Sequence, residues 1–263
     1  MRDGDGKASK PVRRGLSRRV WLRLALYGAP ALAAASSVAL EPRWLRRRTI
    51  HLPGGPGPRV AHFTDTHFKG DRALLQHAID AVNEVRPDLV CFTGDIVEDR
   101  AFLDEALALF SGIKAPLFGV PGNHEYWSGV PFEPIARCFA DTGGAWLVDE
   151  VATWEGITLV GRARRRPDWQ RDGSGPVLAL THYPLTAEDF LPGETDLILA
   201  GHSHGGQVRL PFYGAPILPG QVGPYDLGLF EREGWRLYVN PGIGTWQYPV
   251  RFLCRPEVTL FTW

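Results

Sequence analysis

The chain has 263 residues, of which 44% are hydrophobic and 22% are charged, so it is long enough for one large domain with an ordinary apolar core. Its net charge is zero, but residues 1–39 carry eight Lys and Arg against two Asp and Glu. The rest holds 21 basic and 27 acidic residues, a net charge of −6, which excludes a nucleic-acid groove driven by bulk positive charge. We therefore expect no nucleic-acid partner, and we expect a monomer.

The N-terminal segment has the pattern of an export signal. Residues 13–23 contain five arginines, and the run at 24–40 is apolar and uncharged. A basic region followed by an apolar region and small residues is typical of a secretory signal. The sequence SRRVWLR resembles the twin-arginine export consensus, with Arg18 and Arg19 as the pair, and Ala39 ends a candidate cleavage site.

A retained membrane anchor is the alternative, because a run of 17 residues is near the lower limit for a membrane span. In both cases the basic side stays in the cytoplasm, which places the body on the extracytoplasmic face of the bacterial cell membrane. We therefore expect residues 1–40 to be a twin-arginine-type signal or an N-terminal membrane anchor, and residues 41–263 to be the functional domain.

The body begins with an alternation of short apolar runs and helical patterns. Apolar residues at helical spacing predict helices over Arg72–Val85, Phe102–Phe110 and Pro134–Ala140. The runs between them are short, rich in Val, Leu, Ile or Phe, and bounded by turn residues, as in buried strands. Strands dominate after about residue 140, so the sequence predicts an α/β domain with two sheets and helices outside.

Five of the predicted strands end in loops that contain Asp, Asn or His. In open α/β sheets, ligands bind beyond the carboxyl ends of the strands, so we predict that these loops form one site. The candidate residues are Asp65, His67, Asp95, Asn123, His124, His182, His202 and His204. Taken singly, such an Asp is usually a turn former and such a His is usually a hydrogen-bonded packing residue.

The combination predicts a metal centre, because five of the eight histidines of the chain lie in this set. Imidazole and carboxylate groups together suit divalent Mn, Fe or Zn. Eight donors are too many for one tetrahedral site, so we expect two divalent metal ions about 3.5–4 Å apart. The three cysteines, Cys91, Cys138 and Cys254, are widely spaced and are expected to be packing residues.

The motif blocks DTH, GDIVE, GNHE, TH and GHSHGG occur in this order from Asp65 to Gly206. They resemble the calcineurin-like metallophosphoesterase superfamily. The segments GHSHGGQVRLP and NPGIGTW resemble its bacterial membrane-associated branch, in which a twin-arginine signal or an anchor precedes the domain. The resemblance implies a four-layer αββα sandwich of two mixed sheets flanked by helices, and it implies a hydrolase of phosphoric esters.

The resemblance also assigns three residues to each metal ion and one residue to both. The assignment is Asp65, His67 and His204 for the first ion, Asn123, His182 and His202 for the second, and Asp95 as the bridge. A water between the ions would lose its proton near neutral pH and act as the nucleophile. His124 would stay free of metal and donate a proton or a hydrogen bond to the substrate, with Glu125 in a supporting role.

The substrate is less well defined by the sequence. Two carboxylates against two divalent cations leave a positive site, which suits a phosphate ester, and by analogy we expect a phosphodiester or pyrophosphate rather than a monoester. It would be lipid-linked or derived from the envelope. The arginines at 162–166 form either a clamp for an anionic head group or a solvated loop, and 43–48 is a second basic cluster. Four aromatic residues are expected at the mouth of the site: Tyr126, Trp127, Trp246 and Tyr248.

Two alternatives differ in function. The first is a catalytically inactive module on the same fold, which the complete ligand set argues against. The second is an enzyme like the UDP-diacylglucosamine pyrophosphatases of lipid A synthesis, which the export signal argues against because that step is cytoplasmic. A β-lactamase-like hydrolase is excluded, since the chain contains no H-x-H-x-D-H block.

Overall fold

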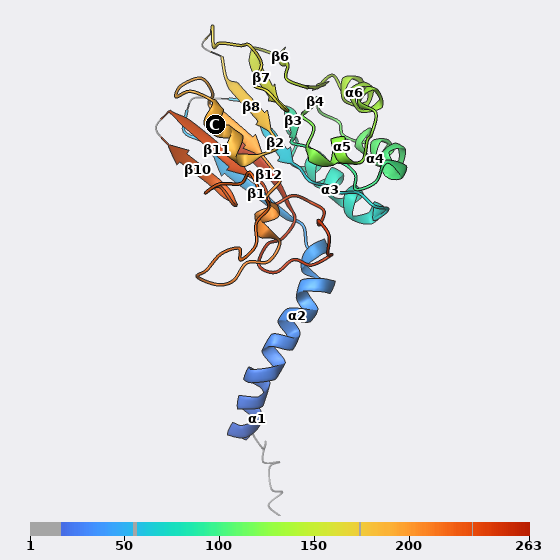
Figure 1. Cartoon of the computed structure of the whole chain (residues 1–263), viewed down its shortest axis with the longest axis vertical. Helices are drawn as coiled ribbons and strands as arrows, with labels where there is room; N and C mark the ends of the chain where they lie inside the picture. Colours follow the sequence, from blue (N-terminus) through green and yellow to red (C-terminus); the bar gives the residue numbers. More distant parts are fainter. Residues whose placement is uncertain (1–16, 55–56, 174, 233) are drawn as a thin grey trace, which may run out of the picture.

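Two six-stranded β-sheets pack face to face and form the body of the molecule (Figure 1). The computed structural model describes residues 17–54, 57–173, 175–232 and 234–263. The first sheet has the spatial order β1 (Arg46–His51), β12 (Glu257–Thr262), β2 (Val60–Phe63), β3 (Leu89–Phe92), β4 (Leu117–Gly119) and β5 (Ala145–Trp146). The second has the order β10 (Gly228–Arg232), β11 (Trp235–Val239), β9 (Leu197–Ala200), β8 (Val177–Thr181), β7 (Ile157–Arg162) and β6 (Val151–Trp154).

Both sheets are mixed, but most neighbouring strands are parallel. The antiparallel pairs are β12 with β2 in the first sheet, and β10 with β11 and β6 with β7 in the second. Strands β2, β3 and β4 run parallel and end at one edge of the first sheet, and β8 and β9 end together in the second. The predicted α/β fold of two mixed sheets flanked by helices is thus confirmed, and the parallel strands place their carboxyl ends where a ligand site is expected.

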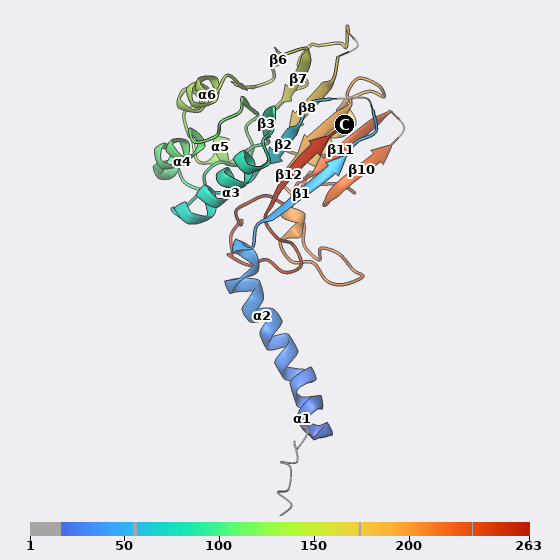
Figure 2. The same cartoon turned by 180° about the vertical axis from the view of Figure 1, so that it is seen from behind.

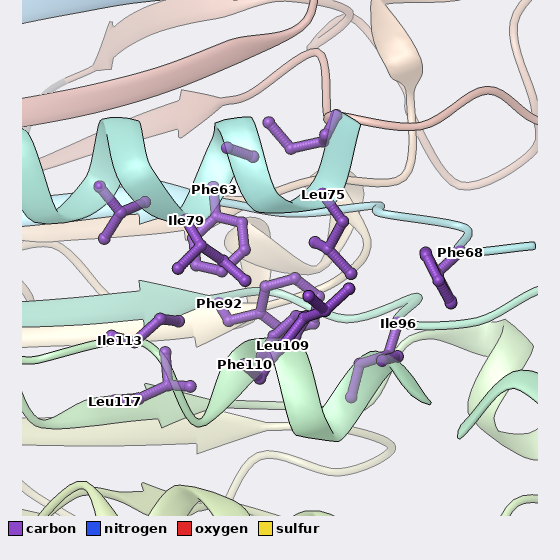
Figure 3. Packing of buried hydrophobic residues seen from close by; sticks show 14 of the residues in the cluster. Phe63, Phe68, Leu75, Ile79, Phe92, Ile96, Leu109, Phe110, Ile113 and Leu117 are labelled. Carbon is purple, nitrogen blue, oxygen red and sulfur yellow. The ribbon is translucent and has the colours of Figure 1, made fainter. Parts of the chain in front are cut away.

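Helices α3 (Arg72–Glu84), α4 (Leu103–Phe110) and α6 (Phe132–Asp141) cover the outer face of the first sheet (Figures 1 and 2). They confirm the three helices predicted from apolar spacing. In α3 the side chains of Leu75, Ile79 and Val82 are buried, because they recur on one face of the helix. They pack on the aromatic rings of Phe63 and Phe92 from the sheet (Figure 3).

Side chains fill the space between the two sheets, and a short helix and loops cover the outer face of the second sheet. The space between the sheets is filled by a dry cluster of aliphatic and aromatic side chains that includes Cys91. The outer face of the second sheet is covered by the 3-10 helix Pro184–Asp189 and by loop residues such as Phe190 and Tyr225. Cys91 and Cys254 are buried and Cys138 is half-buried, and all three are free thiols, as their predicted packing role requires.

The basic cluster at 43–48 contains an edge strand that the sequence did not predict. Its polar residues hide the strand signal, but β1 pairs in parallel with β12 along its whole length. Arg46 and Arg47 form ion pairs with Glu257 and Glu84. Charged side chains on an edge strand prevent pairing with another chain, which gives this cluster a structural explanation.

The N-terminal helix projects away from the sandwich (Figures 1 and 2). It consists of α1 (Arg18–Arg23), a short π-helical segment (Leu24–Gly28) and α2 (Ala29–Ala39). The helical stretch Arg18–Arg43 is long and apolar enough to cross a membrane, a property that signal sequences share. Part of the predicted basic region, with Arg13 and Arg14, lies outside the described residues.

A buried arginine organises the loop that follows β11. Arg251 is fully buried, and its guanidinium donates hydrogen bonds to four backbone carbonyls. The acceptors are Cys254, Pro241, Gly242 and Gly244. The Gly244 N–H in turn donates to the carbonyl of Asp65 over 2.7 Å, so Arg251 holds the loop against one of the candidate site residues.

We expect Arg251→Met to lower the free energy of unfolding by about 3 kcal/mol, because several buried carbonyls lose their only strong donor. Thermal and denaturant unfolding of the full chain in detergent measures this loss. Arg255→Met is the matched control, since Arg255 also donates to two backbone carbonyls, those of Trp44 and Leu45, but is half-buried rather than fully buried. Water can replace its bonds, so its loss should cost less than about 1 kcal/mol. Equal losses in the two variants would contradict a special role for Arg251.

Candidate metal centre

The structure brings all eight predicted residues together at one edge of the paired sheets. The loops after β2, β3 and β4 supply five of them, and the loops after β8 and β9 supply three. Asp65 and His67 follow β2, Asp95 follows β3, and Asn123 and His124 follow β4. His182 follows β8, and His202 and His204 follow β9. Seven are buried and His202 is half-buried. Both sheets therefore contribute to a single polar site.

One group of donor atoms contains Asp65, His67 and His204. The Nε2 atoms of the two histidines lie 3.0 Å apart. An Asp65 carboxylate oxygen lies 3.7 Å from Nε2 of His67 and 3.4 Å from Nε2 of His204. These three residues offer ligand atoms close enough to hold one metal ion.

A second group lies beside the first and shares Asp95 with it. His182 Nε2 lies 3.0 Å from the Asn123 side-chain oxygen and 3.1 Å from Nδ1 of His202. Asp95 Oδ2 lies 3.2 Å from Nε2 of His182 and 3.4 Å from Nε2 of His67 in the first group. The Asp95 carboxylate thus stands between the two groups.

The donor set fits divalent cations. Ligand atoms about 2.0–2.2 Å from a cation lie about 3–3.6 Å from one another. The donor distances here, from 3.0 Å to 3.7 Å, are close to that spacing. The outer nitrogens of His67 and His182 bond to Glu98 at 2.7 Å and to the Thr93 carbonyl at 2.6 Å. Such bonds orient a ligating imidazole and leave its other nitrogen facing the site.

The backbone around the donors is strained. Five of the eight residues have positive φ, between 38° and 65°, where side chains with a Cβ are disfavoured. They are Asp65, His67, Asp95, His202 and His204. Each such residue costs of order 1–3 kcal/mol, and strain of this kind persists at functional sites where surrounding bonds fix the backbone. Here the His67 N–H donates to the Asp95 carbonyl at 3.0 Å, and the His202 N–H donates to the Asp65 carboxylate at 3.0 Å.

The backbone passes so close to the two carboxylates that only glycine fits at the points of contact. A Cβ on Gly201 would overlap the carboxylate of Asp65, and one on Gly122 would overlap that of Asp95. The carboxylates are therefore held directly against the backbone of neighbouring loops, which leaves their position little freedom.

The carboxylates of the site favour positive charge at the positions of the neighbouring imidazoles. Burial opposes the charged form of His67, but hydrogen bonds to Asp65 and Glu98 outweigh it and raise the pKa of His67 to about 10. Burial is likewise outweighed at His182, where the Asp95 carboxylate raises the pKa to about 9. The imidazoles in turn hold the pKa values of Asp65 and Asp95 below their usual range, despite the burial of both carboxyls. Protons thus occupy the positions that a cation would take, and the two compete.

Glu125 supports the centre through bonds to the backbone. Its fully buried carboxylate accepts the N–H groups of Asp95, Ile96 and Gly122 at 2.6–2.9 Å. It therefore fixes the backbone of two ligand loops rather than the ring of His124. Burial raises the pKa of Glu125 to about 7, against which these backbone bonds act.

His124 stands at the rim of the first group. Its N–H donates to Asp95 Oδ1 at 2.8 Å, which binds the start of α5 (Asn123–Trp127) to the centre. Its ring packs edge-on against His67, and its Nδ1 lies 3.4 Å from Glu98. By distance alone His67, Asp95 and His124 also form a group that can hold a metal ion. The sequence analysis missed Glu98, because a carboxylate that bonds the outer nitrogen of a ligand has no spacing signal.

The arginines at 162–166 are partly neutralised within the chain. Arg162 pairs with Asp189 at 2.7 Å, and Arg166 pairs with Glu194 at 2.6 Å. Arg164 is exposed and lies over the ring of Tyr126 at 3.9 Å. Arg162 and Arg166 are therefore paired within the chain, and the clamp for an anionic head group stays a prediction.

The aromatic residues expected at the mouth take different positions. Trp127 is exposed, and its ring lies 5.1 Å from that of His124. Trp246 is tied by backbone hydrogen bonds to the side chain of Gln207, three residues after His204, and Tyr248 is exposed nearby. The sequence analysis did not include Tyr183, whose ring lies 4.6 Å from that of His202.

Comparison with known proteins agrees with this geometry. Residues 58–206 match the family model of the calcineurin-like phosphoesterases. The chain is 30% identical to the uncharacterized metallophosphoesterase YkuE of Bacillus subtilis (strain 168), over 94% of this chain and 97% of that protein. It is 28% identical to the phosphodiesterase YaeI of Escherichia coli (strain K12), over 84% and 88%.

A further relative is a transmembrane protein with a metallophosphoesterase domain from Danio rerio, with 27% identity over 77% of this chain. The chain spans 52% of the length of that relative. The family match covers more than half of the chain and includes all eight site residues. The chain therefore belongs to the calcineurin-like phosphoesterase family and is a metal-dependent hydrolase of phosphoric esters.

Proposed function

We propose that the protein is a dinuclear phosphodiesterase that works at the extracytoplasmic face of the bacterial cell membrane. The observation that carries this proposal is the pair of donor groups joined by the Asp95 carboxylate. The first ion would be held by Asp65, His67 and His204, the second by Asn123, His182 and His202, and Asp95 would bridge them. The nitrogen and oxygen donors suit Mn, Fe or Zn.

The ions would supply an activated water near neutral pH and positive charge for the phosphate oxygens. The chain's own residues set the balance of that charge. Asp65 and Asp95 are the two carboxylates in the donor groups, and Asn123 contributes a neutral oxygen, so the loaded site keeps a net positive charge. An anionic phosphoester is the substrate that such a site favours.

We assign His124 to the substrate rather than to an ion. His67 already has two partners in the first group, and the His124 ring packs edge-on against the His67 ring at 4.5 Å. The Glu98 carboxylate lies 3.4 Å from Nδ1 of His124, and a proton attracted to Nδ1 would leave Nε2 to interact with the leaving oxygen or with a phosphate oxygen. Burial lowers the pKa of His124, which favours proton transfer once the ring is charged.

The membrane location is proposed on two grounds. The helical stretch Arg18–Arg43 has the length and composition of a span, and one relative is a transmembrane protein by name. Basic residues precede the apolar part, so the domain at 41–263 would lie outside the cytoplasm, with residues 1–40 as a twin-arginine signal or anchor. This side of the membrane disfavours the lipid A step, and the phosphodiesterase relative supports diesters over monoesters.

A substrate panel tests the proposed activity. Full-length protein loaded with Mn²⁺, Fe²⁺ or Zn²⁺ is assayed against bis(p-nitrophenyl) phosphate, p-nitrophenyl phosphate, nucleotides and UDP-linked lipids, with metal analysis of the same samples. We expect kcat/KM for the diester to exceed that for the monoester by at least about tenfold. A preference for the monoester, or metal-loaded protein with no hydrolysis of any ester, would contradict the proposal.

A further inference from the structure

A cavity of about 490 Å³ lies where the end of α2 meets the domain. Its walls come from four segments: the end of α2 with the turn that follows, the loop after β2, the start of α3, and the loop after β11. The volume is within the range of small-molecule sites. The lining contains both apolar side chains and polar or charged ones, so a ligand that fits the cavity has both characters.

The cavity adjoins the metal centre through one shared residue. His67, which belongs to the first donor group, is part of the lining, and so is Lys69 two residues further along the chain. Lys69 donates to the Thr245 carbonyl at 3.2 Å, and it forms no ion pair with any other described residue. Arg43, the other cation of the lining, is paired with Asp71 at 2.8 Å. Lys69 is thus the cation that an incoming phosphate would meet beside the centre.

The end of α2 supplies part of the apolar lining. Val38, Ala39 and Pro42 come from α2 and the turn after it, and Leu74 and Pro249 come from α3 and the loop after β11. The end of the helix is attached to the domain, since the Arg251 N–H donates to the Ser37 carbonyl at 2.9 Å. Ser37 itself is buried, at 7% exposure. The cavity is therefore lined both by a helix with the composition of a membrane span and by His67 of the metal centre.

Exposed apolar side chains lie at the same end of the domain. Phe212, Tyr213 and Ile217 are all more than 70% exposed, in the loop after β9. Figures 1 and 2 both show this loop beside the end from which α2 leaves. The loop is tied to the centre because the Gly220 carbonyl lies 2.9 Å from Nε2 of His202. Exposed aromatic and aliphatic residues next to a membrane helix suit the boundary between lipid head groups and acyl chains.

We propose that this cavity binds the apolar part of an amphiphilic phosphoester, a phosphate ester carried by a membrane lipid, and that the end of α2 is retained as its wall. The inference rests on the proposed function, because the phosphate would reach the same metal centre. It also decides between the two fates of the N-terminus. Cleavage after Ala39 would remove Val38 and Ala39 from the cavity and would break the bond from Arg251 to Ser37.

The test fills the part of the cavity that α2 lines and compares two substrates. Metal-loaded full-length protein is assayed on phosphatidylglycerol vesicles and on bis(p-nitrophenyl) phosphate, which needs no apolar tail. Ala39→Trp should lower kcat/KM for the lipid at least about tenfold more than for the soluble diester. Ala35→Trp, on the same helix but outside the cavity lining, is the matched control and should change neither value.

A binding measurement separates this result from an effect on catalysis. The affinity of metal-free protein for a fluorescent lysophosphatidylglycerol, measured by displacement, should be at least about tenfold lower in Ala39→Trp than in the wild type. If Ala39→Trp does not fold, Val38→Phe takes its place in both measurements. The intact mass of the protein recovered from membranes should include α2.

Three results would overturn the inference. They are an unchanged substrate ratio in a folded cavity variant, a mature protein that begins after residue 39, and wild-type protein that cleaves the soluble diester but neither binds nor cleaves the lipid. The last of these leaves the proposed function intact. Wild-type protein that cleaves neither substrate would instead reject the proposed function, and the inference with it.

Discussion

Asp95→Asn should lower kcat/KM for bis(p-nitrophenyl) phosphate by about a thousandfold or more, which corresponds to about 4 kcal/mol of transition-state stabilisation. Its carboxylate is the one that lies within 3.4 Å of imidazole nitrogens in both donor groups. An amide has a single weak oxygen ligand and no charge, so it cannot bridge two cations. We therefore expect the variant to lose metal as well as activity, because the bridge serves both sites.

Metal analysis and steady-state kinetics on the same preparation test this expectation. Asp99→Asn is the matched control, because Asp99 lies four residues further along the same loop, is exposed, and caps a 3-10 turn through the Ala101 N–H. The control should keep its metal and its activity. Near-wild-type turnover by Asp95→Asn would rule out a bridged dinuclear centre.

His124→Ala should separate the proton-transfer role from metal binding. For diesters with poor alkyl leaving groups we expect kcat to fall by about 10²–10³-fold, within the range of general acid catalysis. For nitrophenyl diesters the loss should stay below about tenfold, because nitrophenolate leaves without a proton. The dependence of kcat on the leaving-group pKa measures the difference, and it should be steeper in the variant than in the wild type.

Two observations complete the test of His124. The variant should keep the metal content of the wild type, since the proposed ligands do not include His124; lost metal would show that His124 belongs to the group formed with His67 and Asp95. His77→Ala, on the exposed face of α3, is the control for replacement of an imidazole and should have no effect. Equal losses on both classes of diester would reject proton donation and leave only positioning of the phosphate.

The convergence of Asp65 and Asp95 was predictable because its signal is local. Each follows an apolar run directly, and the parallel strands β2 and β3 bring their carboxyl ends to one edge. His182 follows β8 of the second sheet, so its approach to them depends on the packing of the two sheets. Helix α3 was predictable for a similar reason, since its buried residues recur at helical spacing and Asp71 caps its first turn.

The features that were not predicted depend on long-range contacts or on polar residues. Strand β1 is polar because it lies at an edge, so its sequence carries no apolar alternation. The role of Glu125 arises from backbone groups some 30 positions earlier in the chain, with no spacing rule to reveal it. The cavity lies where α2 meets the domain, a contact that includes the bond from the Arg251 N–H to the Ser37 carbonyl, between residues far apart in the sequence.

Titration of metal-free protein with Mn²⁺ tests the central claim most directly, with bound metal, hydrolysis of bis(p-nitrophenyl) phosphate and electron paramagnetic resonance followed together. Activity should saturate at about two ions per chain, and the spectrum should show a pair of exchange-coupled ions, as expected for ions about 3.5–4 Å apart. Full activity with one ion per chain, or two bound ions without coupling, would contradict a centre bridged by Asp95.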